Sequence, residues 1–418
     1  MAGQIQLSFV NFKKDSYILV EGKQIADRFF IINQGKVLIS KDVEVVEEER
    51  GNVLGPGDFF GVVSTMSSHS HIENARALTD VVLISVHKDQ YSELIQKNTS
   101  VAMKIILEFS KRLRYLDEAL SRLTLKSTAE IGPSHLYNVA EYYIRQSQYN
   151  QAYYAYTKYL KYCPHSDNEK AVRERMMKIA IYAQGVKTEF GPDEFNRIYP
   201  KDSMLFAEGE PGNELFIIQK GSVTIAKVVE ESEVLLAVLK PGDIFGEMAL
   251  LEAKPRNASA VAYEECQVLA VNRANFQRMI VTQPQLISRL TTLLADRIWF
   301  IYKQLANTLI TDPVGRVYDV LLIQLEKNRI PSDSQNPYTF DFGPRELANM
   351  AGLNLRDANL VLKKVLENKK LIMEKDKIQT TSVGEIYKQD EFYRKMQKIE
   401  KARQEARSQN SASGGFPV

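Results

Sequence analysis

The chain of 418 residues is poor in the residue types that usually carry catalysis, metal binding or cross-linking, with two cysteines, five histidines and one tryptophan. Cys163 and Cys266 fall in different predicted domains and have no His or Cys at metal-ligand spacing. We therefore expect two buried free thiols in a reducing, cytoplasmic environment. The histidines pair with no nucleophile and no metal set, so we predict neither a metal site nor an enzyme.

Long apolar runs are also missing. No run of 18 apolar residues is present, so the sequence predicts no transmembrane helix and no membrane partner. The N-terminal residues 1–6 have neither the basic start nor the apolar core of a signal peptide. With 54 basic and 52 acidic residues the formal net charge is +2, so any surface for nucleic acid must be local. The length predicts two to four domains.

The most informative stretch covers residues 241–262, where a Pro-Gly-Asp turn is followed by Gly246, Glu247 and about one helical turn of apolar residues. Backbone N–H groups at a helix N-terminus suit a phosphate. Arg256 supplies a bidentate, always-charged fork for the same group. The Glu247 carboxylate can only accept hydrogen bonds, and a ribose hydroxyl can donate them. A phosphate and a ribose hydroxyl held on one loop describe a cyclic nucleotide.

This stretch closely resembles the phosphate-binding cassette of the cyclic nucleotide-binding domain family, whose pattern is F-G-E, then small and apolar residues, then R-x-A. The resemblance implies that Glu247 binds the ribose 2′-hydroxyl, and that Arg256 and the backbone around Ala258 bind the cyclic phosphate. The candidate ligand-binding residues of the cassette are Phe245, Gly246, Glu247, Met248, Ala249, Arg256, Asn257, Ala258 and Ser259. A surface turn with a solvated Glu and Arg is the alternative interpretation.

An earlier part of the chain repeats the pattern. Residues 29–35 recur as 215–221, 186 positions later (215 − 29 = 186). Residues 56–61 recur as 241–246, 185 positions later (246 − 61 = 185). The sequence thus predicts a second β-roll at the N-terminus, but Val62, His71 and Glu73 replace Glu247, Arg256 and Ala258 there. We expect this copy not to bind the same ligand. A different ligand, held by the loop from Ser64 to His71 with Arg76, is the alternative.

Between the two copies the sequence is helical in character. Apolar residues at helical spacing predict a helix over residues 99–126. Residues 133–164 predict two helices around a turn at 148–150, and the spacing of their small residues and tyrosines resembles one tetratricopeptide repeat. A third helix is expected over residues 169–183. We interpret the segment as a spacer within the chain, and a docking site for another protein is the alternative.

A second long helix is predicted from Pro284 to Thr308, and Asp312 and Pro313 then supply the N-cap and first position of the next helix. The apolar residues repeating along the long helix are Leu286, Leu290, Leu294, Ile298, Ile301 and Leu305. A cassette, a long helix, the motif D-x-x-G-R-V and a winged helix-turn-helix resemble the layout of the catabolite activator or cyclic AMP receptor protein (Crp/Fnr) family. The resemblance implies a homodimer through helix 284–308 and an approach of Ile301 and Tyr302 to the base. Since an isoleucine cannot read an amino group, cyclic GMP stays open beside cyclic AMP, which we prefer.

Residues 344–381 supply the predicted winged helix-turn-helix: a first helix, a turn at Gly352, a second helix from Leu355 to about Asn368, and a hairpin. The second helix would enter the major groove of double-stranded DNA through its first turns. The candidate DNA-binding residues are Arg356, Asp357, Asn359, Lys363 and Lys364. Relatives place Arg and Glu at the start of this helix and another Arg one turn on, where this chain has Leu355, Arg356 and Leu360. The half-site of the family is therefore not assumed.

The sequence as a whole predicts an α+β multidomain protein. Its expected parts are a degenerate cyclic nucleotide-binding β-roll with its helix (1–127), a tetratricopeptide-like segment (128–187), an intact β-roll with a long helix (188–310), a winged helix-turn-helix (311–384), and a tail (385–418) that is helical to about Arg407 and disordered from Ser408. We expect a cyclic-nucleotide-responsive transcription regulator. One alternative is a signalling adaptor gated by the nucleotide. Another is a regulatory subunit of a cyclic-nucleotide-dependent kinase, against which the winged helix and the lack of a basic inhibitor segment before residue 20 both argue.

Overall fold

The computed structural model describes residues 8–22, 26–41, 52–125, 132–183, 187–191, 193–229, 232–353, 355–374 and 376–412. The chain forms two compact units. Unit 1 contains Met1–Val10, Asp27–Ile31 and Ile84–Asp296, and unit 2 contains Asn11–Ala26, Ile32–Leu83 and Arg297–Val418. Within the described residues, no helix is both long enough and apolar enough to cross a membrane.

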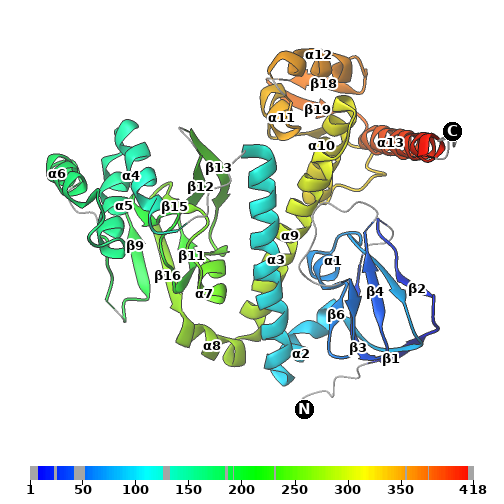
Figure 1. Ribbon diagram of the computed structural model, residues 1–418, viewed down its shortest axis with the longest axis horizontal. Helices are drawn as coiled ribbons and strands as arrows, with labels where there is room; N and C mark the ends of the chain where they lie inside the picture. The colour runs from blue at the N-terminus through cyan, green and yellow to red at the C-terminus, as the bar shows by residue number, and fades with distance from the viewer. Residues whose placement is uncertain are drawn as a thin grey trace, which may run out of the picture. The chain divides into compact units, whose positions relative to one another are not determined.

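The two β-rolls that the sequence repeat predicts are both present (Figure 1). The strands of the first are β1 (Ser8–Phe12), β2 (Tyr17–Leu19), β3 (Arg28–Gln34), β4 (Val37–Ser40), β5 (Val53–Leu54), β6 (Phe59–Phe60), β7 (Asn74–Ala77) and β8 (Val81–His87). Those of the second are β9 (Asn196–Tyr199), β10 (Met204–Phe206), β11 (Glu214–Lys220), β12 (Val223–Val229), β13 (Ser232–Leu239), β14 (Ile244–Phe245), β15 (Ser259–Ala262) and β16 (Cys266–Asn272).

The strand order is the same in the two copies. The first forms sheets β1-β8-β3-β6 and β2-β7-β4-β5, and the second forms β9-β16-β11-β14 and β10-β15-β12-β13. Strands β8 and β16 also share one pattern of buried and half-buried side chains, because alternate residues of a strand point to opposite faces. The repeat in the sequence is therefore also a repeat of the fold. The first copy has this fold although its predicted binding residues are replaced.

Short helices lie at matching places in each copy: α1 (Val62–Ser67), the 3₁₀ turn η1 (Lys88–Gln90) and α2 (Tyr91–Lys97) in the first, and α7 (Glu247–Glu252) and α8 (Arg273–Thr282) in the second. The long helices α3 (Thr99–Leu125) and α9 (Pro284–Thr308) follow, and they begin 185 positions apart (284 − 99 = 185). In a single chain, the apolar side chains of α9 expected to face a second copy are already covered. Leu290, Ile298 and Leu305 are at most 2% exposed, and Ile301 is 8% exposed. The homodimer through α9 stays a prediction, without an exposed seam to support it.

The predicted helical segment consists of α4 (His135–Arg145), α5 (Tyr149–Tyr162) and α6 (Glu169–Ile179), so the turn falls two residues earlier than expected and the third helix ends sooner. Its buried tyrosines form one hydrophobic cluster that also contains Met204, Ala207 and Val228 of the second β-roll. Within unit 1 the segment therefore packs on that β-roll, as Figure 1 shows for α5. Its likeness to a tetratricopeptide repeat stays a prediction.

A buried polar contact joins the same two parts. The Tyr154 hydroxyl donates to the Leu205 carbonyl at 3.0 Å and lies 3.1 Å from Glu210 Oε2. The Lys158 ammonium is 2.9 Å from Glu210 Oε1, with both side chains less than a tenth exposed. Removing one partner of a buried ion pair leaves an uncompensated charge, so the pair fixes where the segment docks. This supports the interpretation of the segment as part of the fold of unit 1.

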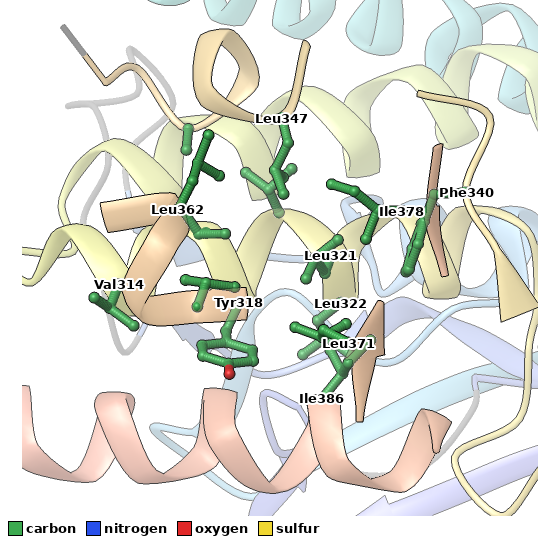
Figure 2. Packing of buried hydrophobic residues seen from close by; sticks show 14 of the residues in the cluster. Val314, Tyr318, Leu321, Leu322, Phe340, Leu347, Leu362, Leu371, Ile378 and Ile386 are labelled. Carbon is green, nitrogen blue, oxygen red and sulfur yellow. The ribbon is translucent and has the colours of Figure 1, made fainter. Parts of the chain in front are cut away.

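The C-terminal head in unit 2 contains α10 (Pro313–Lys327), β17 (Tyr338–Thr339), α11 (Pro344–Met350), α12 (Leu355–Leu366) and the hairpin β18 (Leu371–Glu374) and β19 (Lys377–Thr380). Asp312 Oδ1 accepts the N–H groups of Val314 and Gly315, which confirms the predicted N-cap. Figure 2 shows the core of the head, where Leu321 of α10, Leu362 of α12 and Ile378 of the hairpin converge. The predicted order of helix, turn, helix and hairpin is present.

The tail differs from its prediction. Helix α13 (Val383–Ala412) begins inside the head, where Ile386 is 1% exposed and packs in the core of Figure 2. It continues through Ser408, which we expected to start a disordered tail, and the expectation is wrong as far as Ala412. No proline or glycine follows Gly384 before Gly414, so nothing in the sequence ends the helix earlier. Residues 413–418 lie outside the described residues.

Candidate functional site

The second β-roll builds its cassette from β14, a glycine turn and the buried helix α7. Gly246 adopts φ 72° and ψ 5°, a left-handed conformation that glycine adopts without strain. A Cβ at this position would also lie 2.7 Å from Arg256 Nη1. The backbone conformation and the close approach of Arg256 therefore both favour glycine here.

The two side chains predicted to bind the ligand are both buried in unit 1, with Glu247 2% exposed and Arg256 5% exposed. Arg256 Nη1 donates to the Gly246 carbonyl at 2.5 Å, and Nη2 donates to the Glu214 carbonyl at 2.8 Å. Its Nε has no hydrogen-bond partner among the described residues. A buried N–H without an acceptor is costly, and a phosphate oxygen would satisfy it.

The surroundings of Arg256 are apolar on one side and acidic on the other. Its guanidinium carbon lies 4.2 Å from the centroid of the Phe206 ring. Burial lowers the pKa of Arg256 from its ordinary value, and the carboxylates of Glu210, Glu214 and Glu247 act in the opposite direction. The residues present thus fit a cyclic nucleotide, since Arg256 offers a positive charge and an open Nε donor for the phosphate, and Glu247 offers a carboxylate acceptor for a ribose hydroxyl.

Backbone hydrogen bonds hold the loop that carries Arg256. The Arg256 N–H donates to the Glu210 carbonyl, and the Gly209 N–H donates to the Arg256 carbonyl. Ser259 is 1% exposed, and its hydroxyl accepts the Glu208 N–H, so this candidate binding residue also has a structural contact. Of the other candidates in the cassette, Phe245, Met248, Ala249 and Ala258 are buried.

Asn257, the residue after the arginine, contacts a helix of the first copy. Its Nδ2 donates to Asp117 Oδ2 of α3 at 3.1 Å. Our sequence reasoning missed α3 as a part of this site. The repeat could have indicated this helix. The two long helices are separated by the same 185 residues as the two cassettes, so α3 is the counterpart of α9.

Ile301 and Tyr302 lie in the second half of α9, which belongs to unit 2. There the Tyr302 hydroxyl is 3.4 Å from Glu21 Oε1 of the first β-roll, and the Lys41 ammonium lies 4.9 Å from the centroid of the Tyr302 ring. Both residues are buried. Their approach to a nucleotide base stays a prediction.

The first β-roll has the same cassette backbone as the second, but different side chains stand at the positions predicted to bind the ligand. Gly61 has φ 77° and ψ −2°, close to the values of Gly246. Its N–H donates to Glu73 Oε1 at 2.9 Å, and Glu73 is 9% exposed. A carboxylate of the chain thus accepts a hydrogen bond at the N-terminus of α1, on the loop that matches the one expected to bind phosphate in the second copy. The matching position of the second copy holds Ala258, which has no such group.

We therefore expect one nucleotide to bind per chain. The Glu73 carboxylate would repel a cyclic phosphate in the first copy, and His71 stands there in place of the arginine. A calorimetric titration of the whole protein with cyclic AMP should saturate at one equivalent, and no tight site should remain in the Arg256→Ala variant. Two equivalent sites per chain would contradict this prediction.

On the head, α12 turns its apolar residues inward, with Ala358, Leu362 and Val365 all buried in the core. Asn359, Lys363 and Lys364 are exposed, as a surface that binds DNA requires. Leu360 is also exposed, at 74%. The backbone of Arg356 and Asp357 lies in α12, and their side chains fall outside the described part of the structure.

Both β-rolls are similar to known proteins. The family model for the cyclic nucleotide-binding domain matches residues 9–98 and 196–283. The CRP-like cAMP-activated global transcriptional regulator of Mycobacterium tuberculosis is 30% identical over 165 residues, covering 39% of this chain and 74% of the relative.

Two further relatives are similar at the same level. The cyclic AMP receptor protein of Thermus thermophilus is 31% identical over 172 residues, covering 41% of this chain and 76% of the relative. The cAMP-activated global transcriptional regulator CRP of Salmonella typhimurium is 29% identical over 176 residues, covering 42% of this chain and 83% of the relative. With an intact cassette in the second β-roll and a degenerate one in the first, this chain belongs to the Crp/Fnr family of cyclic nucleotide-binding regulators.

Proposed function

We propose that this protein is a cyclic-nucleotide-responsive transcription regulator whose second β-roll binds a 3′,5′-cyclic mononucleotide and whose head binds double-stranded DNA. The observation that carries the proposal is the buried guanidinium of Arg256, which has an unpaired Nε and lies behind a glycine turn next to Glu247. A buried cation with an open donor is expensive to maintain in a protein that uses it for nothing.

The site supports one arrangement of the ligand. The cyclic phosphate accepts hydrogen bonds from Arg256 and from backbone N–H groups of the cassette, and the 2′-hydroxyl donates to Glu247. Because these groups are buried, each hydrogen bond is made in a medium of lower dielectric constant than water. Cyclic AMP is the proposed effector, in line with the names of the relatives, and cyclic GMP is the alternative.

The DNA contact is proposed for the exposed side of α12. Its first turns carry Arg356, Asp357 and Asn359, which would face base edges in the major groove. Lys363 and Lys364 follow one turn later and suit phosphate oxygens. Leu360 stands between the two groups, where the notable exposure of an apolar side chain suits contact with a thymine methyl group.

The two activities would be coupled through α9, which leads from the second β-roll to Asp312 and the head. A nucleotide that shifts how α9 is held would reposition the head. By linkage, a nucleotide that tightens DNA binding must bind the DNA complex more tightly by the same factor.

Selection of DNA sites from a random pool, with and without cyclic AMP, tests the regulator. We expect Asn359→Ala and Arg356→Ala to change the selected sequence, because these residues would contact bases. Lys364→Ala should instead weaken binding to all sequences about equally and reduce the slope of affinity against salt by about 1. The lysine variant is thus the matched control for the other two.

Failure to enrich any sequence in either condition, in a protein that binds the nucleotide, would favour a nucleotide-gated adaptor. One observation favours that candidate. Met177, Ile181 and Tyr182 at the end of the helical segment are each more than 60% exposed, and exposed apolar side chains of this size can dock another protein.

A further inference from the structure

Helix α3 follows the first β-roll in the sequence, but in unit 1 it packs against α7 of the second. Figure 1 shows the two helices side by side. The contact is polar at its centre. Arg114 Nε donates to Glu252 Oε2 at 2.9 Å, and the two side chains are 9% and 2% exposed. Ser110 Oγ donates to the other oxygen of the same carboxylate at 2.7 Å.

These contacts lie on both sides of the arginine that is proposed to bind phosphate. Arg114 Nη1 donates to the carbonyl of Pro255 at 3.3 Å, and Asp117 accepts from Asn257 at 3.1 Å. Pro255 and Asn257 are the two neighbours of Arg256 in the chain. The loop from 252 to 257, which we call the arginine loop, is therefore held at three points by one helix of the other copy.

The reverse contact occurs in unit 2. Trp299 of α9 stacks on His69 of the first copy, with ring centroids 3.9 Å apart and an interplanar angle of 17°. Trp299 is the repeat partner of Arg114 (299 − 114 = 185), and Tyr302 is the repeat partner of Asp117 (302 − 117 = 185). His69 corresponds to Lys254 of the arginine loop (254 − 69 = 185). At the helix position shared by Arg114 and Trp299, the long helix of each copy thus contacts the corresponding loop of the other copy. Tyr302 differs from Asp117, because its hydroxyl lies near Glu21 outside that loop.

Only one of the two exchanged contacts serves an intact cassette. In the first copy, Glu73 already bonds the glycine N–H of the cassette. In the second copy the arginine loop carries the open donor of Arg256, and α3 is the helix that holds it.

We propose that the first copy is the positioning partner of the nucleotide site in the second copy: α3 holds the arginine loop in its binding geometry and receives the change that ligand binding causes there. This rests on the proposed function of Arg256. It gives the degenerate β-roll a role other than sensing, because its helix would carry the nucleotide signal into the first half of the chain. Arg114 and Asp117 are positioning residues, since they act through the neighbours of Arg256.

Hydrogen–deuterium exchange of the whole protein, with and without saturating cyclic AMP, tests the proposal without any substitution. We expect slower exchange in the peptides that cover residues 247–257, and also in those that cover residues 110–117 of α3. Helix α6 serves as the internal control and should not change. Protection of 247–257 with no change over 110–117 would overturn the proposal and leave the nucleotide site intact. No protection over either stretch would overturn the nucleotide site and the proposal together.

The matched substitutions are Arg114→Met and Lys111→Met, which remove one charge each from the same helix. Lys111 is exposed, so its variant should bind cyclic AMP as the unchanged protein does. Arg114→Met should raise the dissociation constant about tenfold, as expected if only a tenth of the molecules keep the loop in place. It should also remove the protection of α3 while that of 247–252 remains. Should Arg114→Met not fold, Asp117→Ala, at a half-buried position, takes its place with the same expected direction. An unchanged dissociation constant in the folded variant would overturn the proposal.

Discussion

Replacing Arg256 with alanine is expected to weaken the binding of cyclic AMP by about 10²–10³-fold or more. The guanidinium is 5% exposed, so its removal leaves the phosphate buried without its counter-charge. Breaking a buried ion pair from one side costs roughly 3–5 kcal/mol, which corresponds to that loss of affinity. Isothermal titration calorimetry on the whole protein measures it directly.

Three further variants show whether the loss of affinity comes from the charge and shape of Arg256. Glu247→Ala should cost less, about 1.5–3 kcal/mol, because it removes hydrogen bonds to a charged group and no counter-charge. Arg256→Lys should fall between, since lysine keeps the charge and loses the planar fork. Arg278→Ala, an exposed arginine on α8, is the matched control and should bind normally. Since Arg256 also bonds the carbonyls of Gly246 and Glu214, the fold of each variant is checked by thermal melting. Unchanged affinity in a folded Arg256→Ala protein would exclude this cassette as the nucleotide site.

The second large effect is expected at Asp319, which is 0% exposed where α9, α10 and α13 meet within unit 2. Its carboxylate accepts a hydrogen bond from Asn307 Nδ2 at 2.8 Å and another from Arg394 Nη2. Arg394 Nε also donates to Asp390 at 2.8 Å. Asp319→Ala would leave the Asn307 amide and the arginine without their acceptor. We expect the free energy of unfolding of the head to fall by about 3–5 kcal/mol.

Chemical denaturation followed by fluorescence and circular dichroism measures this loss. The control is Glu391→Ala on α13, the helix that carries Arg394. Its partner Lys395 is exposed, so no measurable change is expected. Because Asn307 also bonds the Arg316 carbonyl, the cluster fixes the corner between α9 and the head. The Asp319→Ala protein should therefore lose DNA binding and keep its nucleotide site in unit 1. A head as stable as that of the unchanged protein would show that the cluster contributes nothing to the fold.

Local pattern was enough to predict most helices and strands of this protein and where its cassette lies in the chain. The turn, the glycine and the spacing from Glu247 to Arg256 all lie within 16 residues, so the backbone that joins them also sets their geometry. The cap at Asp312 and the repeated strands are local in the same way. The replaced residues of the first copy, Val62, His71 and Glu73, could be read directly, although the bond from Gly61 to Glu73 could not.

What only the tertiary structure decided is which parts meet. Arg114 and Glu252 are 138 residues apart, and Lys158 and Glu210 are 52 apart (252 − 114 = 138; 210 − 158 = 52). No periodicity in either stretch encodes its partner, because a helix shows in its sequence that one face is apolar and not which surface will cover it. For that reason the sequence suggested α9 as the helix that reaches the nucleotide, whereas in unit 1 α3 is the helix that packs against α7. The same reason explains why α13 was expected to be a solvated tail. Its sequence is charged, and only the structure shows that Ile386 and Asp390 are buried against the head.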